Sequence, residues 1–375
     1  MFVKLLTGLG SVLALLAMGG LVYRRERQRR TARALAINTR NGIVEEHFVR
    51  IGGIDQWILI RGEDRDNPVM LILHGGPGWS NAAFTLPLRS WEKYFTLVQW
   101  DQRGTGKTLG RHGKPGSEGM SFDCRVSDAI ELTEFLLQYL CKDKMILLAE
   151  SMGTLTGLPL AKRRPDLFSA LVATDLYVDI TSNEALKHQL TLERVRSEGN
   201  TKGVTALERI GGDPTAWDLH DWNVNMAWAF KTNEPTPNLD RSLLLPLVLF
   251  SPIYSLQDIY DLFAGFKYST SELFDAFRTF DARRLGTCFE VPFFLFQGER
   301  DVITLTSLAE VYFAEVEAPV KGMSLIKNAG HFAAFTQPEQ FLSALLKHVL
   351  PLANAPDIDA IIHPNQSIST TGKRS

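Results

Sequence analysis

The sequence feature that most constrains the fold is a series of short apolar runs that alternate with segments of helical periodicity. The runs lie at 69–76, 95–104, 145–151 and 170–178. Runs without a polar face are typical of parallel strands that are buried on both sides. The intervening segments at 123–140 and 153–164 repeat apolar residues at helical spacing. This alternation predicts an α/β protein with a doubly wound, mostly parallel central sheet and helices on both faces.

The rest of the chain is divided by changes in this pattern. Before the first buried run, HFVRIGG and DQWILIRG alternate like two strands of a hairpin joined at Gly52–Gly53. A stretch rich in helix formers and aromatic residues interrupts the sheet, and we interpret it as a helical cap. The predicted divisions are an N-terminal anchor with a basic flank (1–30), a connector (31–42), the first part of the core (43–178), the cap (179–285), the second part of the core (286–352) and a disordered tail (353–375).

The N-terminal segment predicts a membrane anchor. Leu5–Tyr23 carries no charge and is followed at once by RRERQRR. A helix of that length just spans a hydrocarbon core of roughly 30 Å. Because the arginines follow the apolar segment, we expect a single-pass anchor with the catalytic part on the cytoplasmic side. A cleaved signal peptide and a peripheral N-terminus are the alternatives.

Net charge argues against a nucleic-acid partner. The 375 residues include 40 Lys and Arg against 42 Asp and Glu, which gives a formal net charge of -2. No zinc-spaced Cys/His cluster is present in the sequence. We therefore expect a small-molecule substrate rather than nucleic acid, and neither a metal nor another cofactor. The oligomeric state is left open.

A nucleophile elbow is indicated by Ala149–Gly153, which reads AESMG and lies between an apolar run and a helical segment. Small residues flank Ser151 because a sharp strand-to-helix turn leaves no room for larger side chains. Such a turn strains the serine backbone and lifts its hydroxyl above the edge of the sheet. We therefore predict that Ser151 is a catalytic nucleophile.

The partners of a nucleophilic serine are a base and an acid that orients the base. In α/β sheets with this elbow, the order along the chain is serine, acid, histidine, each after a strand. Asp301 follows the apolar run at 291–299, and His331 follows the run that begins at 323. We predict Asp301 as the acid and His331 as the base. The alternatives for the acid are Asp175, Glu299 and Asp281.

Two loops after buried runs carry glycines. In His74–Gly78 (HGGPG), we expect the backbone N–H of Gly76, or second that of Gly75, to form an oxyanion hole with the N–H of Met152. The side chain of His74 is interpreted as a brace of this loop. The second loop, DQRGTG at 101–106, lacks Walker spacing, and we expect its charged residues to form structural ion pairs or hydrogen bonds beneath the site.

In this order, HGGPG, WDQRGTGKT, ESMGT, GERD and AGHF resemble the prolyl iminopeptidase family, over roughly residues 45–350. The resemblance implies an α/β-hydrolase fold and release of N-terminal proline from peptides through an acyl-enzyme. It also implies the triad Ser151, Asp301 and His331, and a cap whose acidic residues bind the substrate amine. The candidates for that role are Glu184, Glu193, Glu198, Glu208 and Glu234, with Glu150 beside the nucleophile. Met152 stands where family members usually carry Trp.

The sequence leaves two substrate classes open. The first is a prolyl iminopeptidase-like aminopeptidase, and the second is an esterase or amidase that acts on small, uncharged acyl groups. A carboxylate pair in the cap would favour the peptidase, and an apolar cap lining would favour the esterase. A catalytically silent binding module is a third hypothesis, and the presence of all three predicted triad residues argues against it.

Overall fold

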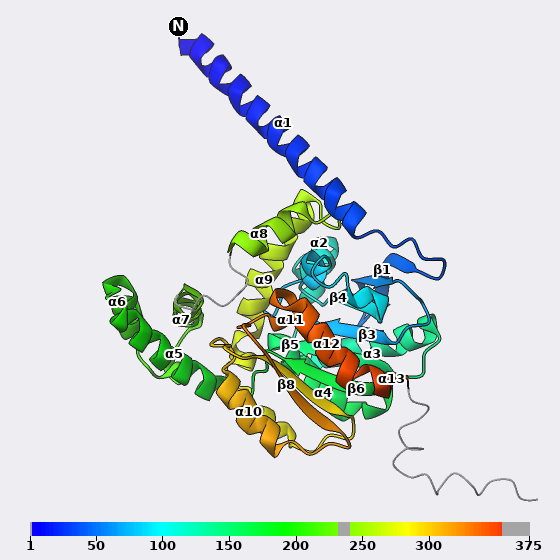
Figure 1. Cartoon of the computed structure of the whole chain (residues 1–375). Helices are drawn as coiled ribbons and strands as arrows, with labels where there is room; N and C mark the ends of the chain where they lie inside the picture. Colours follow the sequence, from blue (N-terminus) through cyan, green and yellow to red (C-terminus); the bar gives the residue numbers. More distant parts are fainter. Residues whose placement is uncertain (1, 232–240, 355–375) are drawn as a thin grey trace, which may run out of the picture.

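A central sheet organises the molecule (Figure 1). The computed structural model describes residues 2–231 and 241–354. Within these ranges the sheet has eight strands in the spatial order β1-β2-β4-β3-β5-β6-β7-β8. The strands are β1 (Ile43–Ile51), β2 (Ile54–Gly62), β3 (Val69–Leu73), β4 (Thr96–Asp101), β5 (Met145–Glu150), β6 (Phe168–Thr174), β7 (Phe293–Gly298) and β8 (Lys321–Ile326).

The strand directions confirm a mostly parallel sheet. Strand β2 is antiparallel to both of its neighbours, β1 and β4. All the other adjacent pairs in the sheet are parallel. The predicted hairpin joins β1 to β2, and its two-residue turn places Gly52 and Gly53 at φ values of +54° and +79°. Glycine suits this turn because side chains with a Cβ disfavour positive φ.

Helices cover both faces of the sheet, as predicted. On one face, Leu132 and Leu158 pack in the same apolar cluster as the strand residue Leu71. On the other face, Phe341 packs in a cluster with Ile72. The helices on the first face are α3 (Phe122–Leu140), α4 (Thr154–Arg163) and α10 (Thr306–Glu315), and the second face is covered by α12 (Pro338–His348).

The predicted cap stretch contributes helices that follow β6 and precede β7. They are α5 (Ile180–Ser197), α6 (Thr201–Ile210), α7 (Leu219–Lys231), α8 (Arg241–Phe250) and α9 (Leu256–Phe277). Trp222 and Phe277 from this stretch pack in one apolar cluster with Met152, next to the predicted nucleophile. The cap boundaries at 179 and 285 stay a prediction. The remaining helices are α2 (Gly106–His112), α11 (Ala333–Thr336) and α13 (Leu350–Ala353).

The predicted membrane anchor is wrong. The segment lies in helix α1 (Phe2–Ala34), but within the described ranges no helix has both the length and the apolar character needed to cross a bilayer. Four glycines, at positions 8, 10, 19 and 20, dilute the apolar character of the segment. The prediction of a single-pass protein with its catalytic part on the cytoplasmic side falls with the span. Helix α1 also extends into the predicted connector at 31–42.

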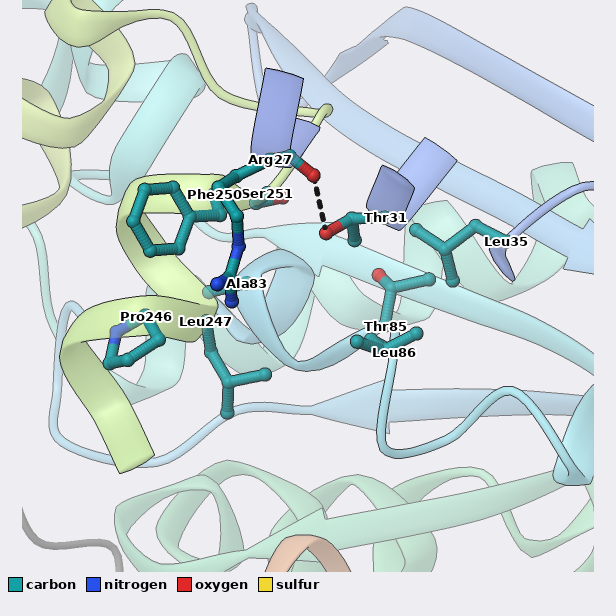
Figure 2. A pocket seen from close by; sticks show the side chains of 10 residues that line it. All are labelled: Arg27, Thr31, Leu35, Ala83, Thr85, Leu86, Pro246, Leu247, Phe250 and Ser251. Carbon is teal, nitrogen blue, oxygen red and sulfur yellow. Dashed lines mark hydrogen bonds between the residues drawn. The ribbon is translucent and has the colours of Figure 1, made fainter. Parts of the chain in front are cut away.

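Two of the arginines that predicted membrane topology, Arg24 and Arg27, instead contact residues at and after the end of α8. Arg24 donates hydrogen bonds to the carbonyls of Leu249 (3.0 Å) and Tyr254 (2.7 Å). The guanidinium of Arg27 lies 4.8 Å from the centre of the Phe250 ring, at a small cavity between α1 and α8 (Figure 2). These contacts hold the C-terminal half of α1 against the end of α8. Residues 232–240 of the predicted cap and most of the predicted tail lie outside the described residues.

A buried ion pair joins the loop after β4 to helix α3 and the first hairpin. Arg103 bonds both carboxylate oxygens of Asp128, at 3.0 and 3.1 Å, and the carbonyl of Gly52 at 2.7 Å. Gln56 donates a further bond to Asp128 at 2.8 Å. Asp101 belongs to a separate network, in which it accepts a bond from the N–H of Lys107 at the start of α2.

Replacing Asp128 should destabilise the fold strongly. In Asp128→Ala, the guanidinium of Arg103 loses the carboxylate with which it pairs, while the arginine side chain remains largely buried. We expect the free energy of unfolding to fall by about 3 to 5 kcal/mol, the usual cost of an unpaired buried charge. Urea denaturation followed by circular dichroism measures the change. Asp143→Ala, at an exposed position, is the matched control and should stay within about 0.5 kcal/mol of the parent; an equal loss in both variants would contradict this account.

Candidate active site

The turn at Ser151 has the geometry expected of an elbow. Ser151 directly follows β5 and has φ of +51°, a conformation that residues with a Cβ rarely adopt. A Cβ added at Gly153 would collide with the carbonyl of Leu73, and one at Gly157 would collide with the Cβ of Ala149. The small residues therefore let helix α4 approach the strands closely enough to form the turn. The hydroxyl of Thr154 donates a 2.6 Å bond to the Ser151 carbonyl and ties the turn to the helix.

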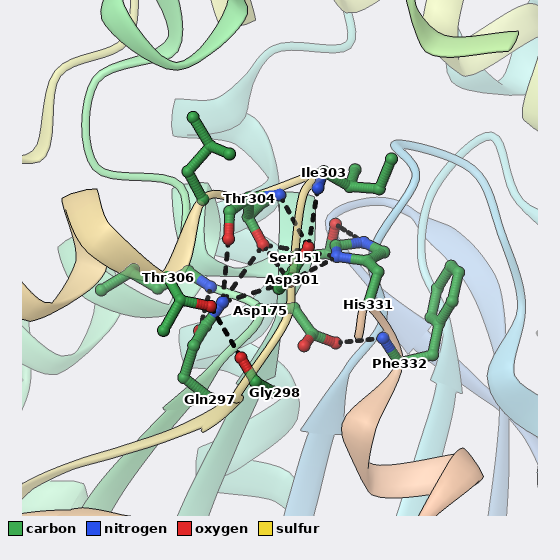
Figure 3. Close-up of polar contacts among 12 residues, drawn as sticks. Ser151, Asp175, Gln297, Gly298, Asp301, Ile303, Thr304, Thr306, His331 and Phe332 are labelled. Carbon is green, nitrogen blue, oxygen red and sulfur yellow. Dashed lines mark hydrogen bonds and ion pairs between the residues drawn. The ribbon is translucent and has the colours of Figure 1, made fainter. Parts of the chain in front are cut away.

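The structure brings the three predicted triad side chains together (Figure 3). His331 Nε2 lies 3.0 Å from Ser151 Oγ, and His331 Nδ1 lies 2.9 Å from Asp301 Oδ2. All three residues are buried. They come from the ends of β5, β7 and β8, because the carboxyl ends of parallel strands share one edge of the sheet. The arrangement has the contacts that a base needs to accept a proton from a serine hydroxyl.

Asp301 is held by a set of donors that the sequence analysis missed. Its Oδ1 accepts bonds from the N–H groups of Ile303 (2.8 Å) and Thr304 (3.0 Å). Its Oδ2 accepts bonds from the Thr304 hydroxyl (2.6 Å) and from Nε2 of Gln297 (3.1 Å). The signal available in the sequence was a threonine three residues after an aspartate that follows a strand, a pattern typical of an Asx turn.

The alternative acids occupy different places. Glu299 accepts a bond from the N–H of Asn328, and Asp281 accepts one from the N–H of Arg283. Asp175 lies at the triad: one carboxylate oxygen of Asp175, one of Asp301 and one ring nitrogen of His331 all lie within 4.8 Å of one another. The same geometry could hold a metal ion only if these groups gave up their present contacts.

The imidazole sits among several carboxyl groups. Burial disfavours the charged ring, but Asp301, Asp175 and Glu150 outweigh burial and raise the pKa of His331 to about 9. Burial, opposed by His331 and aided by the charge of Asp301, raises the pKa of Asp175 to about 7. Burial and the charge of Asp175 raise the pKa of Glu150 to about 8, against a 2.8 Å hydrogen bond from Asn81. Excess negative charge therefore holds protons in this site near neutral pH.

A cavity of about 910 Å³ opens over Ser151 Oγ and His331. Its wall includes the predicted oxyanion-hole residues Gly75, Gly76 and Met152. A Cβ at Gly75 would lie 2.7 Å from the Cβ of Ser151, so the loop approaches the nucleophile as closely as glycine allows. The rest of the wall is mainly apolar and aromatic, with contributions from Trp79, Phe84, Tyr177, Trp222, Met226, Phe230, Phe266, Phe277, Ile303 and Phe332.

The candidate amine-binding carboxylates of the cap have other partners. Glu184 is fully buried and pairs with the ammonium of Lys187, and Asn225 donates a 3.1 Å bond to its second oxygen. The exposed candidates bond along the cap helices: Glu193 with Gln189, Glu198 with Arg194, and Glu208 with Arg196. Glu234 lies outside the described residues. Among the described residues that line the cavity, Glu150 is the one carboxyl group.

His74 lies in the glycine loop. Its Nδ1 bonds the carbonyl of Gly75 at 3.0 Å, and its Nε2 lies 3.5 Å from the N–H of Gln102. Burial lowers the pKa of His74 to about 3, so the ring is neutral. These contacts fit the expected role as a brace between the loops after β3 and β4.

Known proteins share the fold of this chain. A family model described as the alpha/beta hydrolase fold matches residues 68–338. The probable aminopeptidase YbaC of Bacillus subtilis (strain 168) is 27% identical over 301 residues, which cover 80% of this chain and 94% of the relative. The solved proline iminopeptidase of Mycobacterium smegmatis is 14% identical with a TM-score of 0.58, over 83% of this chain and 98% of its own. These likenesses confirm the resemblance to prolyl iminopeptidases.

Another solved structure shows how widely the fold is used. A bacterial membrane phospholipase A is 17% identical with a TM-score of 0.57, over 92% of this chain and 98% of its own. Enzymes with one fold act on many different substrates. Similarity at this level of identity therefore shows the fold and not the substrate specificity. Substrate specificity depends on the residues that line the cavity.

Hydrolysis should depend on pH through His331. A base must be unprotonated to accept the serine proton, and the carboxylates raise the pKa of His331 to about 9. We therefore expect kcat/KM for a neutral ester such as p-nitrophenyl butyrate to rise as pH increases from 6, to reach half of its limiting value near pH 9 and to level off only at higher pH. Initial rates in constant-ionic-strength buffers, corrected for spontaneous hydrolysis, test this. A profile that is already flat between pH 6 and 8 would contradict it.

Proposed function

Since the chain belongs to the α/β-hydrolase fold family, we propose that it is a serine hydrolase that cleaves esters or amides through an acyl-enzyme. The observation that carries the proposal is the continuous contact from Ser151 Oγ to His331 and from His331 to Asp301, at 3.0 and 2.9 Å. The strained φ of +51° at Ser151 supports the assignment, because such strain persists where function requires it.

In the proposed mechanism, His331 Nε2 takes the proton of Ser151 Oγ as that oxygen attacks the substrate carbonyl. Asp301, fixed by its four donors, holds the imidazole in orientation and stabilises the imidazolium that forms. The N–H groups of Met152 and of Gly76, or alternatively Gly75, hold the oxyanion. His331 then returns the proton to the leaving group, and water repeats the sequence to release the acid.

The cavity wall favours an uncharged, apolar acyl group. Its aromatic side chains come from the core loops and from helices α7 and α9, and they offer dispersion contacts but few polar partners. An ionic group would lose much of its hydration against this mainly apolar wall, where the charged residues of the lining are Glu150 and Lys231. Glu184, the buried carboxylate of the cap, is neutralised by Lys187 and is not offered to a ligand. This lining supports the esterase or amidase class.

Ser151→Ala should abolish turnover, and the wild type should discriminate by charge. We expect kcat for p-nitrophenyl butyrate to fall by about 10⁴-fold or more in the full-length Ser151→Ala variant. The matched control is Ser127→Ala, an exposed position on α3, with unchanged turnover. For wild type, kcat/KM for the anionic p-nitrophenyl hemisuccinate should be about 100-fold below that for the butyrate, because the mainly apolar wall solvates a carboxylate poorly. Near-normal turnover by Ser151→Ala would sink the proposal.

A second candidate function, release of an N-terminal proline, is supported by the named relative from Bacillus subtilis and by one residue of the cavity. Glu150 lines the cavity beside the nucleophile and is buried. A substrate ammonium close to it would favour the ionised carboxylate and so lower the raised pKa of Glu150. Under this candidate, Glu150 takes the role that the resemblance assigns to acidic residues of the cap.

Glu150→Gln separates the two candidates. If Glu150 binds the amine, the ratio of kcat/KM for prolyl p-nitroanilide to that for p-nitrophenyl butyrate should fall about tenfold or more, since the charged contact is lost while the carboxamide keeps the shape. Acetylation of the prolyl nitrogen should have the same effect on wild type. An unchanged ratio in the variant, or equal cleavage of the blocked amide, would remove the peptidase candidate and leave the esterase.

A further inference from the structure

A second carboxylate faces the imidazole of His331 from the end of β6. Asp175 follows this strand directly and is fully buried. One of its oxygens, Oδ2, accepts a 2.9 Å bond from the N–H of Phe332, the residue next to His331 (Figure 3). The other, Oδ1, has no hydrogen-bond partner in the described part of the chain. Burying an unpartnered carboxylate oxygen is costly, so this placement requires a reason.

The backbone at Asp175 is also unfavourable. Asp175 has φ of +50°, and Phe332 has φ of +68°. Two non-glycine residues in the left-handed region therefore meet through one hydrogen bond. Strain of this kind persists where the surrounding structure needs a side chain in a particular place. Here the shared result is that the Asp175 carboxylate lies within 4.8 Å of both the imidazole and Asp301.

We propose that Asp175 is a positioning residue that holds the segment carrying His331 and sets the proton affinity of its imidazole. The inference rests on the proposed role of His331 as the catalytic base. Asp301 orients the ring through Nδ1, while Asp175 anchors the backbone next to it and adds a second negative charge nearby. A tightly held imidazole that binds its proton strongly is a stronger base, but it is available only at higher pH.

The charges around Asp175 come from several elements. Glu150 lies at the end of β5, Asp301 after β7 and His331 after β8. From the cap side, Lys187 on α5 interacts favourably with Asp301, and Tyr177 also lies near that carboxylate. Lys187 is already paired with Glu184. The three carboxyl groups near His331 thus exceed the local positive charge, which is why removing one of them should weaken proton binding by the ring.

A purely structural brace makes a different prediction. Asp175→Asn keeps an oxygen that can accept the Phe332 N–H bond, but it removes the negative charge. If Asp175 acts by charge, the variant should keep its fold while the acid limb of the kcat/KM profile moves to lower pH. If Asp175 only braces the loop, the limb should stay where it is in wild type, whatever happens to the plateau.

The test measures kcat/KM of full-length wild type and Asp175→Asn for p-nitrophenyl butyrate from pH 5.5 to 10. We expect the midpoint of the acid limb to fall by about one pH unit or more, equivalent to a tenfold larger unprotonated fraction on the limb. Glu290→Gln removes an exposed carboxylate that lies before β7, far along the strand from the site, and should leave the midpoint unchanged. An unshifted midpoint in Asp175→Asn, or an equal shift in Glu290→Gln, would overturn the inference.

A second readout does not depend on turnover. Proton NMR of the low-field His331 Nδ1–H resonance, assigned by its loss in His331→Gln, reports the titration of the ring directly. We expect a lower titration midpoint in Asp175→Asn than in wild type, and identical midpoints would overturn the inference even if activity changed. If wild type showed no hydrolysis that depends on Ser151, that result would refute the proposed function. The titration of His331 would still decide the role of Asp175.

Discussion

The tight turn at Ser151 is the constraint on which the rest of the site depends. A serine at positive φ between a strand and a helix requires α4 to press against β3 and β5, so Gly153 and Gly157 have no space for a Cβ. The loop of Gly75 must then lie against the serine side chain. Because parallel strands end at one edge, the same turn brings the hydroxyl beside residues that follow β6, β7 and β8.

More carboxyl groups lie at this edge of the sheet than the single acid that a catalytic triad requires. Asp175, Asp301 and Glu150 are all buried near one imidazole. Four donors hold Asp301 in place, while burial and the neighbouring negative charges raise the pKa values of Glu150 and Asp175. Positioning and proton affinity are therefore coupled here: the groups that fix His331 in place are the groups that hold its proton.

Much of this architecture was predictable because it depends on local patterns. Apolar runs, helical spacing and the order of Ser151, Asp301 and His331 follow from periodicity and from the direction of parallel strands. The donors of Asp301 were missed because Gln297 and Thr304 carry no signal stronger than an Asx turn. The α1 prediction failed because a charge-free run followed by arginines resembles an anchor, whereas Arg24 here binds carbonyls at the end of α8. Contacts between distant segments cannot be read from local composition.

The pairing of Glu184 with Lys187 illustrates why motifs in the core say less about substrates than the cap does. A glutamate in a cap helix matches the expected amine ligand by composition, but its charge is cancelled by the lysine one turn later on the same helix. The mainly apolar wall supplied by α7 and α9 then leaves Glu150, a core residue, to interact with a positive charge that enters. A cationic substrate would favour ionised Glu150, so binding of the cation would be accompanied by loss of the proton of this carboxyl group. Substrate charge and pH dependence are for that reason linked properties of this site.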